Sequence, residues 1–383
     1  MNPNLKRYIN TQYQEKFNEK PIIVCSPGRI NLIGEHTDYN EGFVFPAAID
    51  KGIVTAIEKS QTELCTIYAS DLDEILSFSL GDVQPIPNGN WRNFILGVVG
   101  ELQKLHIEVK PFNMVFGGDL PKGAGLSSSA ALENSVVYGL NTLFNLKLSK
   151  SQMILISQKA EHNYVGVRCG IMDQYASMFG EEDHALLLDC RYQKATSYKI
   201  DFKDYELMLI NSNVSHNLVD AEYNDRRLVC EHVAKLLNVP FLRDVNEDML
   251  LQVKSQLSES DYQKALYVVQ ENQRVIELGK ALENNDLQAL GGLLYKAHHG
   301  AQHQFKISCK ELDFLVEETK KHSEILGARM MGGGFGGCTI NIIKKSAVTD
   351  YSNHISKTYQ DTFGINCTIH TVKLSQGTHI IEL

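Results

Sequence analysis

A stretch rich in glycine and serine, residues 117–133, limits the possible structures of this chain more than any other segment. Its glycines allow tight turns and leave no side chain between the backbone and a ligand. The run Ser127–Ser129 offers helix N-caps and hydroxyl donors, and from Ala130 the apolar residues recur at helical spacing. Free backbone N–H groups at a helix start bind anions, most often phosphate. The stretch therefore predicts either a phosphate site or an ordinary capped helix.

Two common nucleotide-binding motifs do not fit this loop. The Walker motif needs Gly-Lys followed by Ser or Thr, and no such tripeptide follows the loop. The dinucleotide motif needs a third glycine at the position that Ser128 occupies. Any phosphate site here thus belongs to another class.

A second stretch, residues 27–40, is dense in polar side chains between segments expected to be strands. Within ten residues it carries Arg29, Glu35, His36 and Asp38. Carboxylates accept hydrogen bonds from hydroxyl groups, and Arg and His donate them. We interpret this segment as a loop that holds a polyhydroxylated ligand, with a solvated loop containing an internal ion pair as the alternative.

Two further features suggest function. Asp173 is an acidic residue in an otherwise apolar run close to Gly170, and a buried Asp must be paired or functional. A second glycine-dense loop, residues 331–338, allows close approach of a ligand or a neighbouring domain.

Length and composition limit the class of protein to which this chain can belong. The length of 383 residues suggests two domains. The formal net charge of −9 argues against a nucleic-acid surface, and a small anionic substrate would need a local basic pocket.

Neither a long apolar run nor an apolar leader is visible, so we expect no membrane span. The eight cysteines are scattered, as in reduced core residues, and we expect a cytoplasmic protein, interpreted as a monomer.

Periodicity predicts alternating strands and helices. We expect strands over 21–26, 43–49, 52–57, 64–69, 75–79, 112–116, 185–189, 205–211, 339–343 and 367–372. We expect helices over 5–19, from 91, from 130, and over 151–165, 218–238, 259–284, 286–299, 309–322 and 346–360.

Three stretches resemble one family. Gly28 to Tyr39 resembles the galactokinase signature, Leu120 to Ala130 resembles the phosphate loop of the wider GHMP kinases (galactokinase, homoserine, mevalonate and phosphomevalonate kinases), and Met331 to Cys338 resembles their C-terminal glycine motif. The order and spacing fit over nearly the whole chain, and the first motif separates galactokinases from the other members. Lys122 and Ala124 fall where the phosphate-loop pattern is loose.

The resemblance implies an α+β fold of two domains, over 1–195 and 196–383, with an S5-like first half, a ferredoxin-like second half and the active site in the cleft between them. It also implies transfer of the γ-phosphoryl group of ATP to the C1 hydroxyl of galactose.

The resemblance also carries roles onto matching residues. The catalytic base would be Asp173, and its charge-stabilising partner Arg29. Substrate would be held by Glu35, His36, Thr37, Asp38, Gly170 and Tyr223. ATP would lie on Ser70, Gly123, Ala124, Gly125, Leu126, Ser127, Ser128 and Ser129, with Trp91 near the nucleotide. Mg²⁺ would be held by Ser129 and Glu161, through oxygen ligands of the kind it prefers.

Alternatives stay open at this point. One is a kinase for a related sugar such as N-acetylgalactosamine, because one pocket residue can change tolerance at C2. Another is a catalytically silent sensor of sugar and ATP. His299 and His303 form an i, i+4 pair that could bind a metal, but no carboxylate lies at matching spacing, so we favour a helix end.

Overall fold

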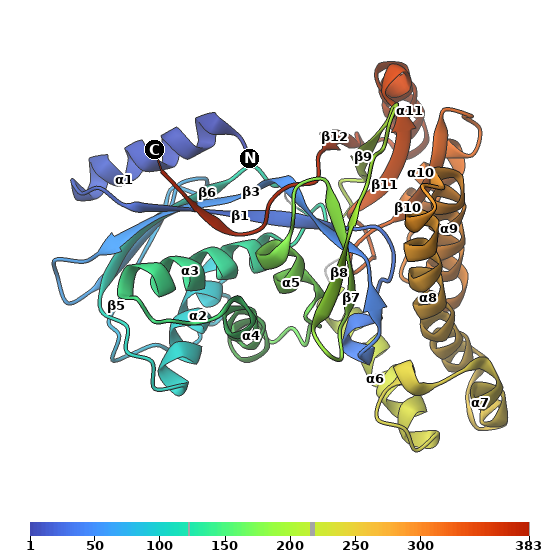
Figure 1. The fold of residues 1–383 in the computed structure, drawn as a ribbon, viewed down its shortest axis with the longest axis horizontal. Helices are drawn as coiled ribbons and strands as arrows, with labels where there is room; N and C mark the ends of the chain where they lie inside the picture. Colours follow the sequence, from blue (N-terminus) through green and yellow to red (C-terminus); the bar gives the residue numbers. More distant parts are fainter. Residues whose placement is uncertain (122, 215–218, 383) are drawn as a thin grey trace.

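The computed structural model describes residues 1–121, 123–214 and 219–382. Its first half is a six-stranded sheet in the order β13-β1-β3-β6-β4-β5 (Figure 1). The strands are β1 (Ile22–Asn31), β3 (Pro46–Lys59), β4 (Cys65–Ala69), β5 (Glu74–Phe78), β6 (Phe112–Gly118) and β13 (His379–Ile381). The helices of this half are α1 (Pro3–Phe17), α2 (Trp91–Lys104), α3 (Ser128–Phe144), α4 (Lys150–Ala160) and α5 (Met172–Phe179).

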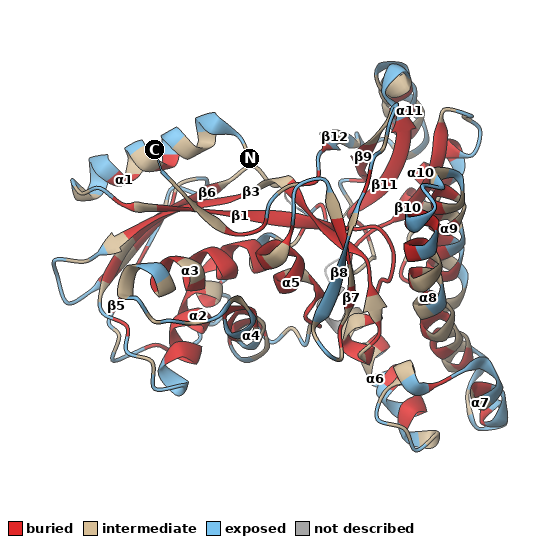
Figure 2. Ribbon diagram, in the orientation of Figure 1, coloured by how far each residue is buried: buried red, intermediate tan, exposed pale blue. Residues whose placement is uncertain are grey.

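Helices cover both faces of this sheet. α1 lies on one face, while α3 and α5 pack on the other, with α2 and α4 behind α3 (Figure 1). Strands β1 and β3 are buried along most of their length (Figure 2), because apolar side chains on both faces meet a helix layer.

The second half contains a four-stranded antiparallel sheet in the order β10-β11-β9-β12. The strands are β9 (Tyr205–Asn211), β10 (Ile325–Met330), β11 (Cys338–Lys344) and β12 (Thr368–Val372). The helices are α6 (Val219–Leu236), α7 (Glu247–Gln252), α8 (Glu259–Glu283), α9 (Leu287–Gly300), α10 (Lys310–Thr319) and α11 (Val348–Phe363). With helices between β9 and β10 and between β11 and β12, this is the expected ferredoxin-like connectivity.

Strand β9 shows how this sheet is held. Leu207 and Leu209 join one apolar cluster and Met208 and Ile210 join another, as the two-residue period of a strand requires. The sheet is therefore buried on both faces.

A small third sheet and several short turns complete the fold. The sheet has the order β2-β7-β8, from β2 (Phe43–Val44), β7 (His184–Asp189) and β8 (Lys194–Lys199). The 3₁₀ turns are η1 (Asp38–Asn40), η3 (Leu242–Asp244), η4 (Lys254–Gln256) and η6 (Lys345–Ala347), and the π-helical turns are η2 (Glu161–Val165) and η5 (Ala301–Phe305). None of the helices in the described ranges is long and apolar enough to cross a membrane.

The structure confirms the α+β class and shifts several boundaries. The strand expected over 21–26 continues to Asn31 because it pairs with β3 through a bulge between Pro27 and Arg29, so Arg29 lies in a strand and not in a loop. The helix expected over 151–165 changes to a π-helical turn at Glu161. Lys122 and the expected helix start at residue 218 lie outside the described residues. The C-terminal strand β13 returns to pair with β1 of the first sheet.

Candidate active site

A cavity of about 140 Å³ lies where the end of β1, the turn after it, the start of α5 and the loop after β10 meet. Its lining residues are Arg29, Glu35, His36, Asp38, Glu161, Val167, Cys169, Gly170, Met172, Asp173, Tyr223, Gly332 and Gly333. The lining thus brings together, from both halves of the chain, residues predicted to be catalytic, to bind the sugar or to bind the metal, but none predicted to bind ATP.

Asp173 is held by a buried arginine. Arg29 Nε donates to Asp173 Oδ1 at 2.7 Å, and Nη2 donates to Oδ2 at 2.8 Å. Burial opposes the charge on Arg29, but Asp173 more than compensates, so the pKa of Arg29 lies above its ordinary value. The arginine therefore remains a fixed positive charge at the cavity wall.

The glycine-serine loop before α3 packs directly on this pair. The hydroxyl of Ser127 donates to Asp173 Oδ2, and the Arg29 side chain donates to the carbonyl of Gly125. Ser127 is the N-cap residue of α3, but its side chain makes no capping hydrogen bond, because its backbone is left-handed (φ 58°) and its hydroxyl is turned to the carboxylate. A side chain at Gly28 would meet the carbonyl oxygen of Leu126 at 2.7 Å, so glycine lets β1 approach the loop.

Glu35 lies in a buried ion pair between the two halves. Its Oε1 accepts from Arg329 Nη2 at 2.7 Å and from the backbone N–H of Gly332 at 2.8 Å. Both side chains are at most 2% exposed. These contacts tie the turn after β1 to the second glycine loop.

His36 is fixed through both ring nitrogens. Nε2 lies 3.0 Å from the carbonyl oxygen of Gly333, which can only accept, so Nε2 carries the proton and Nδ1 accepts from Tyr39 Oη at 2.7 Å. Burial lowers the pKa of His36 to about 4. The neutral ring packs on Tyr223, with ring centres 4.8 Å apart, and shapes the cavity wall.

Asp38 and Gly170 lie in direct contact. A Cβ built on Gly170 would stand 1.9 Å from Asp38 Oδ2, so only glycine leaves room for this carboxylate. Burial, and then the charge of Asp173, raise the pKa of Asp38 to about 7. The cavity therefore holds one carboxylate that is poised near neutrality beside the Arg29–Asp173 pair.

Thr37 has a different environment from its neighbours. Its hydroxyl lies 2.9 Å from the carbonyl oxygen of Gly34 and 2.6 Å from that of Phe43, and the residue does not line the cavity. The contacts stabilise the turn that presents Glu35, His36 and Asp38.

Of the two predicted oxygen donors for a divalent cation, Glu161 lines the same cavity as Asp173, and Ser129 is not among its lining residues. Glu161 lines the cavity and is 7% exposed, while Ser129 is half-buried in the first turn of α3. Near Glu161, Glu133 is fully buried, and burial followed by the charge of Glu161 raises its pKa well above the ordinary value, although a hydrogen bond with Gln174 lowers it. Hydroxyl and carboxylate oxygens are the donors that Mg²⁺ prefers.

Two residues predicted near the nucleotide lie outside this cavity. Ser70 donates its hydroxyl to the carbonyl of Phe116 at 3.0 Å. Trp91 belongs to the main apolar core and donates Nε1–H to Glu74 at 2.7 Å. The other predicted ATP residues, 123–129, form the loop and first turn of α3, with left-handed glycines at 123 and 125.

Sequence reasoning missed Arg329. It lies in β10, a strand that was not predicted, and pairs with Glu35. A charged residue in an apolar run directly before the glycine loop was the one available indication.

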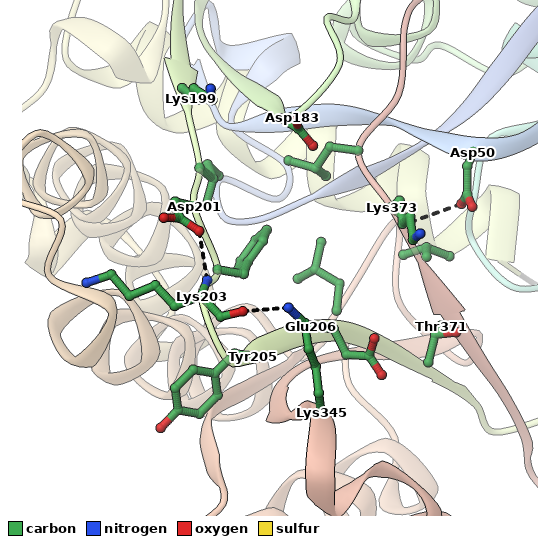
Figure 3. A pocket seen from close by; sticks show the side chains of 15 residues that line it. Asp50, Asp183, Lys199, Asp201, Lys203, Tyr205, Glu206, Lys345, Thr371 and Lys373 are labelled. Atoms are coloured by element: carbon green, nitrogen blue, oxygen red, sulfur yellow. Dashed lines mark hydrogen bonds between the residues drawn. The ribbon is translucent and has the colours of Figure 1, made fainter.

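A larger cavity, about 680 Å³, lies elsewhere (Figure 3). The β8–β9 connection and the chain after β12 form its walls, and it contains none of the predicted site residues. It has four lysines and four carboxylates, and Lys345 donates to the carbonyl of Lys203 across it (Figure 3). We assign the chemistry to the smaller cavity because Asp173 and Arg29 line it.

Comparison with known proteins agrees with this geometry. Family models match over residues 11–59 (galactokinase galactose-binding signature), 93–181 (GHMP kinases N terminal domain) and 279–361 (GHMP kinases C terminal). A mevalonate kinase structure from Methanococcus jannaschii shares the fold, with a TM-score of 0.68 at 17% identity over 93% of this chain and 99% of that one. Fold and site together define a GHMP kinase.

Closer relatives narrow the class. The galactokinase of Haemophilus influenzae is 39% identical over 99% of both chains, and that of Thermotoga petrophila is 38% identical over 94% of this chain and 99% of its own. The structure of Lactococcus lactis galactokinase complexed with galactose superposes with a TM-score of 0.92 at 30% identity, covering 97% of this chain and 98% of that one. The chain belongs to the galactokinase family.

Proposed function

We propose that the protein transfers the γ-phosphoryl group of ATP to the C1 hydroxyl of galactose, giving galactose 1-phosphate and ADP. The observation that carries this proposal is the placement of Asp173. Its carboxylate, held by Arg29 and Ser127, faces the cavity that Glu35, His36 and Asp38 also line. The relative crystallised with galactose shares this fold over nearly its whole length.

The sugar would be held by polar groups of the cavity. Asp38 and the second carboxylate oxygen of Glu35 accept from sugar hydroxyls, and Gly170 offers its backbone. His36 and Tyr223 form an aromatic wall, since both nitrogens of His36 are already occupied. Thr37 acts through the turn that its hydroxyl stabilises.

The phosphates of ATP would lie on residues 123–129. The start of α3 presents free N–H groups and the positive end of the helix dipole. The left-handed glycines of the loop leave its backbone open to a ligand. Ser70 would lie beside this loop, at the end of β4.

Mg²⁺ would be held by Ser129 and Glu161. A bound Mg²⁺ supplies charge neutralisation on the transferring phosphates. Glu133 lies buried near Glu161 with a pKa well above its ordinary value, so a cation held by Ser129 and Glu161 would favour its ionised form.

Asp173 would orient the C1 hydroxyl and receive its proton as the O–P bond to the sugar forms and the bond to ADP breaks. A carboxylate has about four lone-pair positions. Arg29 fills two and Ser127 a third, which leaves one for the substrate. Arg29 balances the charge on the transferring group, as a loose phosphoryl transition state requires.

A coupled ADP-release assay with Mg-ATP tests the proposal. The acceptors are galactose, glucose, N-acetylgalactosamine, mevalonate and homoserine. We expect turnover with galactose. Faster turnover with N-acetylgalactosamine would reassign the acceptor, and silence with every acceptor, while galactose and ATP still bind by calorimetry, would indicate a sensor.

A further inference from the structure

A third concave surface, about 780 Å³, lies on the C-terminal half between α8, α9, the turn η5 and the residue after α10. We call it the basic groove and define it by Arg274, Lys296, His299, His303 and Lys320. Glutamine side chains supply further donors to its lining, and no Asp or Glu is among the described residues that line it.

This concentration of positive charge is unusual for the chain. The protein carries a formal net charge of −9. The cavity of Figure 3 has as many carboxylates as lysines, so its formal charge cancels. The basic groove has no such compensation within its lining.

Arg274 is the fixed cation of the groove. Its Nε donates at 2.6 Å to Glu271, which is fully buried and also accepts the backbone N–H of Gly34 at 2.9 Å. Arg274 Nη2 is buried without a hydrogen-bond partner among the described residues, and it lies 3.0 Å from the position of a Cβ on Gly300. An unsatisfied buried donor is costly, so an acceptor at this place would stabilise it.

Two histidines lie in the same groove and add further potential donors for an anion. The rings of His299 and His303 lie with their centres 4.5 Å apart, one helical turn from each other. Burial lowers the pKa of His299, and nearby His303, Lys320, His298 and Arg274 lower it further. An anion bound beside these groups would favour protonation of the His299 ring.

A metal does not explain this arrangement. Within the described parts of the chain no three residues of the types His, Cys, Asp and Glu are placed to hold a metal ion. The other groups of the groove are cations and amides, which repel or ligate metals poorly.

We propose that the basic groove binds the phosphate group of a small phosphorylated molecule. Arginine and lysine form strong charge-assisted hydrogen bonds with phosphate oxygens, and amide and imidazole N–H groups add donors. Lys296 makes no ion pair within the described residues, and Lys320 pairs with Glu317 at the surface, where such a pair contributes little. Both lysines can therefore turn to a ligand. The proposal does not depend on the sugar that the enzyme phosphorylates.

The test follows the histidine ring signals by NMR while phosphate is added. Galactose and Mg-ADP are present in excess, so that the phosphate loop is filled. His299→Asn and His303→Asn assign the signals. Two phosphate probes are compared, inorganic phosphate and galactose 1-phosphate, and the tighter of the two identifies the source of the phosphate group. Heparin is added separately as a polyanion control.

We expect a saturable shift of the His299 and His303 signals with at least one probe. In Lys296→Gln/Lys320→Gln the dissociation constant should rise at least about tenfold. The control Lys280→Gln/Lys310→Gln removes the same charge from exposed positions outside the groove and should keep the wild-type constant. Equal weakening in both double variants would overturn the proposal.

Two other results would also overturn it. One is the absence of a saturable shift with either probe. The other is a shift with heparin alone, which would indicate a polyanionic macromolecule. Because the reporters are side chains of the groove, failure here is distinguishable from failure of sugar phosphorylation.

Discussion

Arg29 and Asp173 meet edge to edge, with Nε 2.7 Å from Oδ1 and Nη2 2.8 Å from Oδ2. The arginine side chain is 5% exposed and the carboxylate 29%, so the cation is buried and the acid opens to the cavity. A planar, two-point contact of this kind fixes the rotation of the carboxylate as well as its position. The orientation of Asp173 is therefore set by strand β1, to which Arg29 belongs.

Replacement of Asp173 by asparagine should separate chemistry from binding. Asp173→Asn keeps the shape but removes the proton acceptor, so we expect kcat to fall at least about a hundredfold. Galactose should still bind, as measured by calorimetry, and the circular dichroism spectrum should be unchanged. A kcat near the wild-type value would refute the role of Asp173.

Ser127 should support catalysis through Asp173. Ser127→Ala removes a hydrogen bond to a charged acceptor, and we expect kcat to fall about tenfold with a smaller change in the KM for galactose. Ser128→Ala, at the exposed neighbouring position, is the control and should affect kcat less. If both variants lose kcat equally, the effect belongs to the loop and not to the hydroxyl.

The local sequence predicts much of the site but not its pairings. Arg29 and Asp173 could each be singled out from their surroundings, yet 144 positions separate them, and only the family resemblance joined them. The contact of Ser127 with Asp173 depends on a left-handed backbone that serine rarely adopts. The partnership of Glu35 with Arg329 depends on a sheet formed by the other half of the chain.

The helices and strands could be predicted where the spacing of apolar residues is regular. The long helices α8, α9 and α11 lie close to their expected ranges. Strand β10 was missed because Gly327 and Arg329 interrupt its apolar pattern, and β8 because its residues are mostly exposed and polar. The short helix α5 was missed because an apolar run of this length does not distinguish helix from strand.

Gly170 should tolerate no side chain. In Gly170→Ala the new Cβ would stand 1.9 Å from Asp38 Oδ2, so the carboxylate must leave its observed position. We expect the KM for galactose to rise at least about tenfold, which corresponds to a loss of about 1.4 kcal/mol in binding. The control is Gly292→Ala, where a Cβ meets nothing within 4 Å. An unchanged KM in Gly170→Ala would show that Asp38 does not need its observed position.

The pH dependence should reveal Asp38. Its pKa is raised to about 7, so the carboxyl is protonated below that pH and accepts fewer hydrogen bonds from sugar hydroxyls. We expect kcat/KM for galactose to fall as the pH drops below about 7, since this ratio reports groups of the free enzyme. In Asp38→Asn the value of kcat/KM should be lower than in the wild type, and it should no longer fall as the pH drops below about 7. If kcat/KM of the variant still falls below about pH 7, a group other than Asp38 causes the pH dependence.

Arg329 should contribute to stability and galactose affinity through Glu35. Arg329→Met removes the partner of a buried carboxylate, and such a loss typically costs about 3–5 kcal/mol in the free energy of unfolding. The double variant Glu35→Gln/Arg329→Met leaves no buried unpaired charge, so much of the stability should return in urea unfolding. Galactose affinity should not return, because an amide at position 35 replaces a carboxylate oxygen at the cavity. Equal stability of Arg329→Met and the wild type would contradict the buried ion pair, and recovery of affinity in the double variant would remove Glu35 from the sugar site.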